Sequence, residues 1–233
     1  MKICVLLLLL LSCGRVSAQN REIVEAVSGE DLSPKVSYQM QFVFPEFRNG
    51  EVVFVGVPRI GGVFNYNILI GEMQFIDNEQ VLALANMNRV LFVSIDDRIF
   101  YPFNSREFTE ELYSIGNIFL RVRYRGRAAR HTQRGAYGME TSTASITSYS
   151  SLLADSRAHE LTIPENVVIT VNNIYYLVES NGKHKQIRNK RTFTRQFPMY
   201  KSQINSFVNE NKIRFNNPND LIAMFQFIDG LSN

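Results

Sequence analysis

Short apolar runs separated by turn residues dominate the chain from Val36 to Phe103. The runs are rich in Val, Ile, Phe and Tyr, which favour β-strands, and turn sequences such as Arg48-Asn49-Gly50 separate them. A turn roughly every 8 to 12 residues is typical of consecutive antiparallel strands. The segment is therefore predicted to be a meander that forms a β-sandwich or a barrel-like module, with its first strand at residues 38–44.

Two segments alternate between polar and apolar side chains, as strands with one buried face do. In the first, Asn65 and Asn67 alternate with aromatic or aliphatic residues, and we expect both asparagines on a polar face. In the second, residues 117–127, Val122 and Tyr124 face one way and arginines face the other. Both segments are predicted to be half-buried strands.

The apolar period changes from two to about 3.6 after Arg188, which predicts amphipathic helices. Ile204 and Phe207 belong to one helix, and a second helix begins with Asn217 as N-cap and Pro218 at its first position. The predicted fold class is α+β, an antiparallel β-sandwich or barrel-like module followed by a small C-terminal helical module.

Composition divides the chain into consecutive segments. After a leader at residues 1–18, these are a polar tether at 19–35, a β-rich module at 36–131, a partly ordered excursion rich in Ser, Thr and Gly at 132–165, a late β-hairpin of the same module at 166–188, and the helical module at 189–233.

The leader reads as an export signal. Lys2 precedes an apolar run from Ile3 to Leu11, and Val16-Ser17-Ala18 has small residues at the positions that signal peptidase requires. The mature chain would begin at Gln19. We therefore expect the protein in the periplasm or cell envelope of a Gram-negative bacterium.

A second interpretation of the same leader is a lipoprotein signal. Leu10-Leu11-Ser12-Cys13-Gly14 fits the sequence recognised before a cysteine that becomes lipidated, so Cys13 is the alternative processing site. Both cysteines of the chain, Cys4 and Cys13, lie in the leader. After cleavage behind Ala18 no thiolate chemistry would be available.

The charge of the chain is nearly balanced. The leader contains Lys2 and Arg15 and no acidic residue, so its removal lowers the formal net charge from +3 to about +1. Nucleic acid is therefore not an expected partner. No other segment is apolar enough to span a membrane, so membrane association is expected only through a partner or a lipid on Cys13.

Few residues suit metal or nucleophilic chemistry. His131, His159 and His184 lack the short spacings of zinc ligands. Ser156 lies close to His159, but in a low-complexity segment without a nucleophile elbow. We expect no catalytic residue, no metal site and no cofactor.

Three glutamates are the candidates on which a hydrolase would depend. Glycoside hydrolysis needs two carboxylates across a cleft, and Glu107, Glu110 and Glu111 lie close together in the sequence. Their clustering favours an exposed turn, which makes a carboxylate-dependent hydrolase the least favoured function.

An arginine stripe is the strongest candidate for a binding site. Alternation places Arg121, Arg123, Arg125 and Arg127 on one face of a strand. Four guanidinium groups repel one another, so this face must meet solvent, carboxylates of a neighbouring strand, or an anionic partner. The sequence leaves the choice between the chain's own acids and a partner open.

Several motifs resemble a family of uncharacterised exported proteins of the Bacteroidetes group. The likeness is carried by Pro45-Glu46-Phe47, by the run from Phe64 to Ile76, by Leu82-Ala83-Leu84-Ala85-Asn86, and by Tyr175-Tyr176-Leu177-Val178. It extends over about residues 38–230. The resemblance implies a strand-rich front, a late hairpin and terminal helices, and it implies no enzymatic activity and no catalytic residue.

The function expected from these observations is that of a non-catalytic accessory protein that docks on an envelope protein or a surface component. The alternative is a binding module for a glycan or another anionic ligand.

Overall fold

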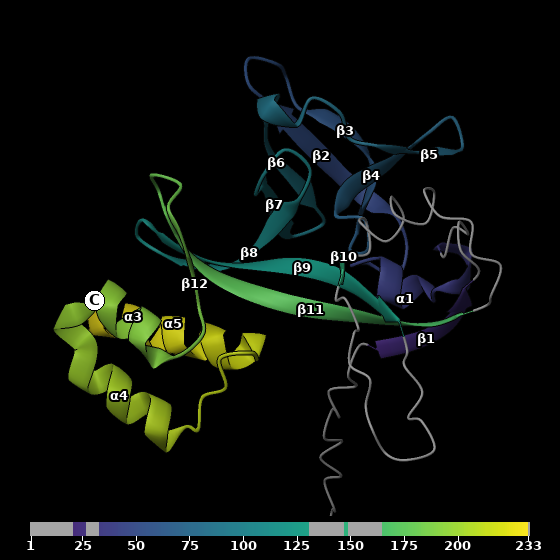
Figure 1. Cartoon of the computed structure of the whole chain (residues 1–233). Coiled ribbons are helices and arrows are strands. Elements are labelled where there is room, and N and C mark those ends of the chain that lie inside the picture. The colour runs from purple at the N-terminus through teal and green to yellow at the C-terminus, as the bar shows by residue number, and fades with distance from the viewer. Residues whose placement is uncertain (1–20, 27–32, 131–146, 149–164, 233) are drawn as a thin grey trace, which may run out of the picture.

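The computed structural model of the chain describes residues 21–26, 33–130, 147–148 and 165–232 (Figure 1). The predicted leader with Cys13 lies outside these residues, as does most of the predicted excursion at 132–165. The described strands are β1 (Arg21–Ala26), β2 (Arg48–Phe54), β3 (Ile60–Asn67), β4 (Glu72–Asp77), β5 (Gln80–Ala83), β6 (Val90–Ile95), β7 (Arg98–Pro102), β8 (Phe108–Ile115), β9 (Ile118–Arg130), β10 (Thr147–Ser148), β11 (Glu165–Glu179) and β12 (His184–Gln186). The described α-helices are α1 (Tyr38–Gln41), α3 (Lys190–Gln196), α4 (Lys201–Glu210) and α5 (Pro218–Ser232).

The strands form an antiparallel sheet in the order β1-β11-β9-β8-β7-β6-β2-β3-β4-β5, with β10 beside β9 and β12 beside β11. The sheet is not closed, but it curls strongly. Tyr66 on β3 therefore lies against Phe100 on β7 and Phe108 on β8, with ring centroids 6.1 Å apart in both pairs. The predicted α+β fold, with a barrel-like antiparallel module and C-terminal helices, is confirmed.

A glycine lets the curled sheet approach β9. The N–H of Gly126 donates to the carbonyl oxygen of Ile68, in the turn between β3 and β4, at 3.1 Å. A β-carbon on Gly126 would lie 2.8 Å from the Cα of Leu69, so a larger residue would force the turn away. The β8–β9 ladder reaches only to Glu110 and Val122, so the turn occupies the adjoining edge of β9.

The inner face of the β9–β11 ribbon carries three hydrophobic clusters in succession. Leu120 and Leu177 pack against the C-terminal helices. Tyr124 lies between these helices and the core inside the curled strands. Ala128 and Ile169 pack with residues of β1 and α1. One strand pair thus supports every described part of the core.

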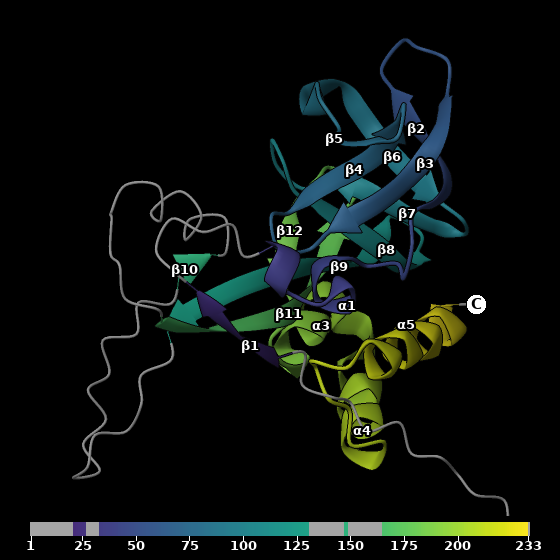
Figure 2. The ribbon, with the colours of Figure 1, turned by 90° about the vertical axis from the view of Figure 1, so that its right-hand side faces the viewer.

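Helices α3, α4 and α5 cover one end of this inner face (Figure 2). Phe225 of α5 is fully buried, with ring centroids 5.9 Å from Phe193 of α3 and 6.0 Å from Tyr113 of β8. Helix α5 begins where predicted, and the Asn217 side chain accepts the N–H of Asp220 at 3.1 Å. None of the helices in the described ranges is long and apolar enough to cross a membrane.

The first predicted strand, at residues 38–44, is wrong. Tyr38–Gln41 form helix α1, which the Phe42 N–H closes by donating to the Tyr38 carbonyl oxygen at 2.9 Å. Beyond it, the chain makes a single β-bridge, between Phe42 and Asn67.

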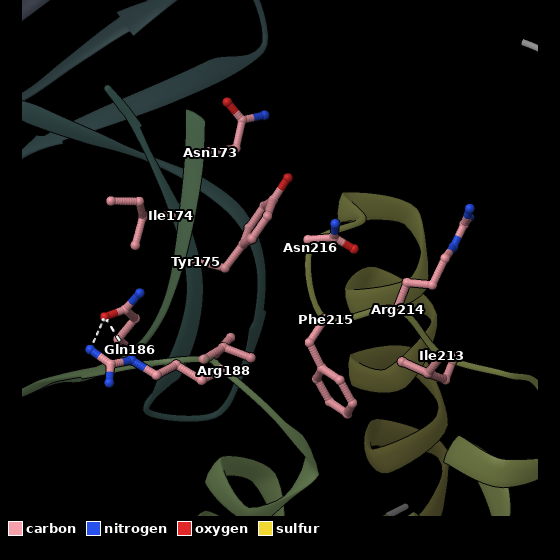
Figure 3. Close-up of a pocket in the computed structure, with 10 residues that line it drawn as sticks. Asn173, Ile174, Tyr175, Gln186, Arg188, Ile213, Arg214, Phe215 and Asn216 are labelled. Carbon is pink, nitrogen blue, oxygen red and sulfur yellow. Dashed lines mark hydrogen bonds between the residues drawn. The ribbon is translucent and has the colours of Figure 1, made fainter. Parts of the chain in front are cut away.

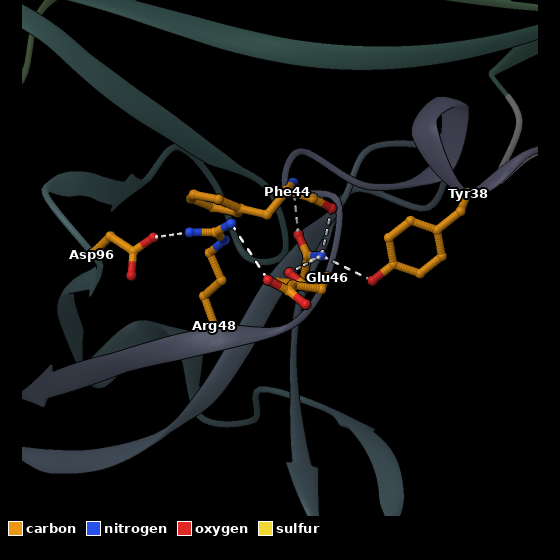
Figure 4. A network of polar contacts seen from close by, with 6 residues as sticks. Tyr38, Phe44, Glu46, Arg48 and Asp96 are labelled. Carbon is orange, nitrogen blue, oxygen red and sulfur yellow. Dashed lines mark hydrogen bonds and ion pairs between the residues drawn. The ribbon is translucent and has the colours of Figure 1, made fainter.

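The Asn65 side chain binds the backbone groups that a neighbouring strand would otherwise bind in the segment after α1. Its side-chain oxygen accepts the N–H of Phe44 at 3.1 Å, and its amide donates to the carbonyl oxygens of Phe44 at 3.0 Å and Glu46 at 3.1 Å. Figure 4 shows this network, with Tyr38 at one end and the ion pair of Arg48 with Asp96 at the other. Asn65 and Asn67 are both buried. The polar face predicted for them is therefore wrong, because their amides satisfy backbone groups inside the fold.

The polar tether predicted at residues 19–35 is wrong for Arg21–Ala26, which form β1. This strand pairs with β11 along its whole length, and Val24 is buried. The carboxylate of Glu22 accepts the N–H and the hydroxyl of Ser37. The ladder with β11, the buried side chain of Val24 and the hydrogen bonds of Glu22 together hold this acidic segment on the sheet.

Candidate functional site

The predicted arginine stripe lies on the outward side of β9, opposite the inner face that contains Val122. We term the outward side of β8, β9 and β11 the arginine face. In its register with β11, Arg121 lies beside Tyr176 and Arg123 beside Ile174. The four arginines of the stripe are all partly buried: Arg121, Arg123, Arg125 and Arg127.

Arg121 is bound within the chain. Its Nη2 donates to Oε2 of Glu111 at 3.3 Å, and its guanidinium lies 3.8 Å from the ring centroid of Tyr101 and 5.0 Å from that of Phe119. Burial lowers the pKa of Arg121, and Glu111 offsets this only in part. Stacking and pairing leave this guanidinium little freedom to meet an external ligand.

Arg123 makes more and shorter hydrogen bonds to its carboxylate partner than Arg121 does. Its Nε and Nη2 both donate to Oε1 of Glu107, at 3.2 and 2.6 Å, and its guanidinium lies 4.6 Å from the ring centroid of Phe103. Burial alone would raise the pKa of Glu107, but hydrogen bonds from Arg123 and Asn104 outweigh it and lower that pKa. For Arg121 and Arg123, the acids that neutralise the stripe belong to this chain.

Arg125 and Arg127 differ from these two. Arg125 lines a small hollow of about 150 Å³ together with Arg106, Glu107 and the turn between β3 and β4. Neither Arg125 nor Arg106 forms an ion pair with a residue that the structure describes. Arg127 lies beside Thr170 in the ladder, and it too has no carboxylate partner within the described ranges. The part of the arginine face whose described arginines form no direct ion pair is therefore centred on this hollow, where Glu107 is the nearest carboxylate.

The three candidate glutamates are not a hydrolytic pair. Glu110 is buried on the inner side, where it accepts from Nε of Arg98 at 2.6 Å and from the hydroxyl of Tyr124. Glu107 and Glu111 face outward and each accepts from an arginine. The exposed turn predicted for them is wrong, because Phe108–Ile115 form β8 and alternation separates the carboxylates.

Of the candidate histidines, the structure describes only His184. It lies on β12, with ring centroids 5.1 Å from Phe103 and 6.1 Å from Tyr176. His131, Ser156 and His159 lie outside the described residues. Within the described part of the chain, no group of three or more His, Cys, Asp or Glu could hold a metal ion.

A second hollow, which sequence analysis missed, lies between the β11–β12 hairpin and the loop joining α4 to α5 (Figure 3). Its volume is about 720 Å³, and its lining combines amides, two arginines and apolar groups. The signal that could have revealed it is Asn173. This polar residue interrupts a series of inward apolar positions on β11 that are buried or partly buried: Val167, Ile169, Val171, Tyr175 and Leu177.

Comparison of the chain with protein-family models, with curated proteins and with solved structures finds no match. The resemblance to exported proteins of the Bacteroidetes group stays a prediction.

Proposed function

We propose that this is an exported, non-catalytic protein of the Gram-negative cell envelope that docks on a partner protein by binding one of its acidic side chains. The observation that carries the proposal is the hollow beside Arg106 and Arg125, where two guanidinium groups form no direct ion pair with a described residue and the nearby Glu107 is already paired with Arg123. The predicted leader at residues 1–18 supports export.

The size of the hollow favours a side chain over a free ligand. Its volume of about 150 Å³ lies below the roughly 300–1,000 Å³ of typical small-molecule pockets. Arg123 also lines it, already fixed by Glu107. A carboxylate that enters would therefore meet Arg106 and Arg125 beside a preorganised ion pair, which favours bidentate recognition.

The surface around the hollow contains the residue types that are enriched at protein–protein interfaces, namely aromatic residues and arginines. Tyr101 and Phe103 are stacked under arginines on the same outward side. Aromatic residues and arginines supply most of the binding energy at protein interfaces, and stacking reduces the side-chain entropy lost on binding.

Co-purification from native envelopes tests the proposal. We expect a stoichiometric partner with the wild-type protein, with recovery that falls as salt rises. The Arg106→Gln/Arg125→Gln variant should lose this partner while keeping the wild-type melting temperature. The matched control is Arg191→Gln/Arg195→Gln, which removes two exposed arginines of α3. Equal partner recovery with both double variants would refute the proposal.

A further inference from the structure

We infer that the hollow between the β11–β12 hairpin and the α4–α5 loop, termed the hairpin cleft, binds a saccharide that carries a carboxylate. Its lining includes Asn173, Tyr175, Gln186, Arg188, Phe215 and Asn216. The cleft shares no residue with the hollow at Arg106 and Arg125. This inference therefore stands independently of the proposed docking function.

Asn173 marks where the inner face of β11 opens. The neighbouring inward residues Val171 and Tyr175 pack in hydrophobic clusters, whereas Asn173 is exposed and lines the cleft. Asn173 thus places an exposed amide, close to the Tyr175 hydroxyl, at a position where the alternation of the strand would otherwise continue an apolar face. An asparagine side chain offers both a donor and an acceptor to a ligand.

Tyr175 provides a polar atom that the fold leaves unused. Its side chain is 2% exposed, and its hydroxyl has no hydrogen-bond partner among the described residues. Burial raises the pKa of Tyr175, and the nearby Asn173 amide opposes the rise without reaching hydrogen-bond geometry. Figure 3 shows the hydroxyl directed to the space between Asn173 and Asn216. A buried unpaired hydroxyl is costly, and a bound ligand would satisfy it.

The charge of the cleft is positive. Arg188 donates from Nε and Nη2 to Oε1 of Gln186, at 3.2 and 3.0 Å, and no described carboxylate pairs with it. Arg214 is bound by Asp220 through Nε at 3.0 Å. Arg188 thus remains the uncompensated cation, already oriented by an amide.

These groups together define the ligand. Amides of Asn173, Gln186 and Asn216 and the Tyr175 hydroxyl suit a ligand with many hydroxyl groups, and the partly exposed residue Phe215 adds apolar lining suited to the C–H faces of a sugar. Arg188 suits a carboxylate. The volume of about 720 Å³ falls within the range of roughly 300–1,000 Å³ typical of ligand pockets.

Isothermal titration calorimetry of the mature chain tests the inference with three probes: trigalacturonate, 3′-sialyllactose and lactose. Binding of either acidic probe, with lactose at least tenfold weaker, is expected, and the two acidic probes distinguish a uronate from a sialate. Arg188→Gln should abolish this preference, while Arg195→Gln should not change it. Absence of binding by both acidic probes, or equal binding of lactose, would overturn the inference, as would binding of an acidic peptide alone.

Tyr175→Phe supplies a signature that a purely structural role would not give. It should raise the melting temperature, because an unpaired buried hydroxyl is removed, and weaken binding of the acidic probe about tenfold. The matched control is Tyr66→Phe, which removes a buried hydroxyl that accepts the N–H of Phe108 at 3.3 Å and should lower the melting temperature. Unchanged affinity in Tyr175→Phe would exclude the hydroxyl from the site.

Discussion

Arg123 and Glu107 are joined by a bidentate ion pair, although Arg123 lies on β9 and Glu107 immediately precedes β8, sixteen positions away in the sequence. The Arg123 guanidinium is covered by the Phe103 ring, so the pair is largely shielded from solvent. Shielded pairs are costly to break, because the remaining charge is left without compensation.

Arg123→Gln should therefore lower the free energy of unfolding by about 1–3 kcal/mol. Arg125→Gln is the matched control on the same strand face and should change it by less than about 0.5 kcal/mol. Urea denaturation followed by circular dichroism measures both. Equal losses in the two variants would show that position on the strand, and not the ion pair, determines the effect.

The same pair predicts a pH dependence of stability. The pKa of Glu107 is lowered in the folded protein. The ionised Glu107 carboxylate therefore stabilises the folded state fully above its unfolded pKa of about 4.3, and this stabilisation is lost as the pH falls through the lower pKa of the folded state. Glu107→Gln should be less stable than wild type at neutral pH, and the difference should shrink on acidification. Melting temperatures of the variant and the wild type, measured from neutral to acidic pH, give this difference in stability. The control is Glu46→Gln, which removes a carboxylate from an exposed ion pair. A difference in stability between Glu107→Gln and the wild type that stays the same at acidic pH would contradict the prediction.

Gly126→Ala should destabilise the protein by about 1–3 kcal/mol, since the new methyl group would collide with the backbone at Leu69. Gly230→Ala is the matched control, and it should raise the stability of the protein instead of lowering it. Gly230 lies in α5 with nothing near its missing β-carbon, so alanine should stabilise the helix by about 0.5–1 kcal/mol. Chemical denaturation of both variants gives the comparison. A neutral Gly126→Ala would mean that the β3–β4 turn does not rest on β9.

Phe225→Ala should lower the free energy of unfolding by about 3–5 kcal/mol, because this ring of α5 is fully buried against α3 and β8. Met199→Ala, at a side chain that is 84% exposed, should cost almost nothing. Calorimetric melting temperatures of the two variants separate these outcomes. A small loss for Phe225→Ala would indicate that the helices are only loosely attached to the sheet.

Local patterns predicted much of the fold, because alternation and helical periodicity report directly on which side chains are buried. The start of α5 at Pro218 and the late hairpin, formed by β11 and β12, are examples. Residues 38–44 could not be predicted in this way. Their structure depends on Asn65, a side chain that binds backbone groups about twenty residues away.

The candidate site was predictable only in part for a similar reason. Alternation places the arginines on one face, but which acids meet them depends on the pairing of β8 with β9. That register shifts at a bulge between Glu111 and Tyr113, which no local pattern in the sequence reveals. The hairpin cleft depends on a still longer connection, from β11 to the loop after α4.

The β9–β11 ribbon also determines how the chain reaches its folded state. Arg130 and Val167 are paired at one end of the ladder although more than thirty residues separate them in sequence. The entropy of closing so long a chain segment must be lost before this end of the ladder can form, and all three clusters include residues of the ladder. Substitutions that weaken this ladder are therefore expected to slow refolding, whereas those within a single cluster should mainly accelerate unfolding.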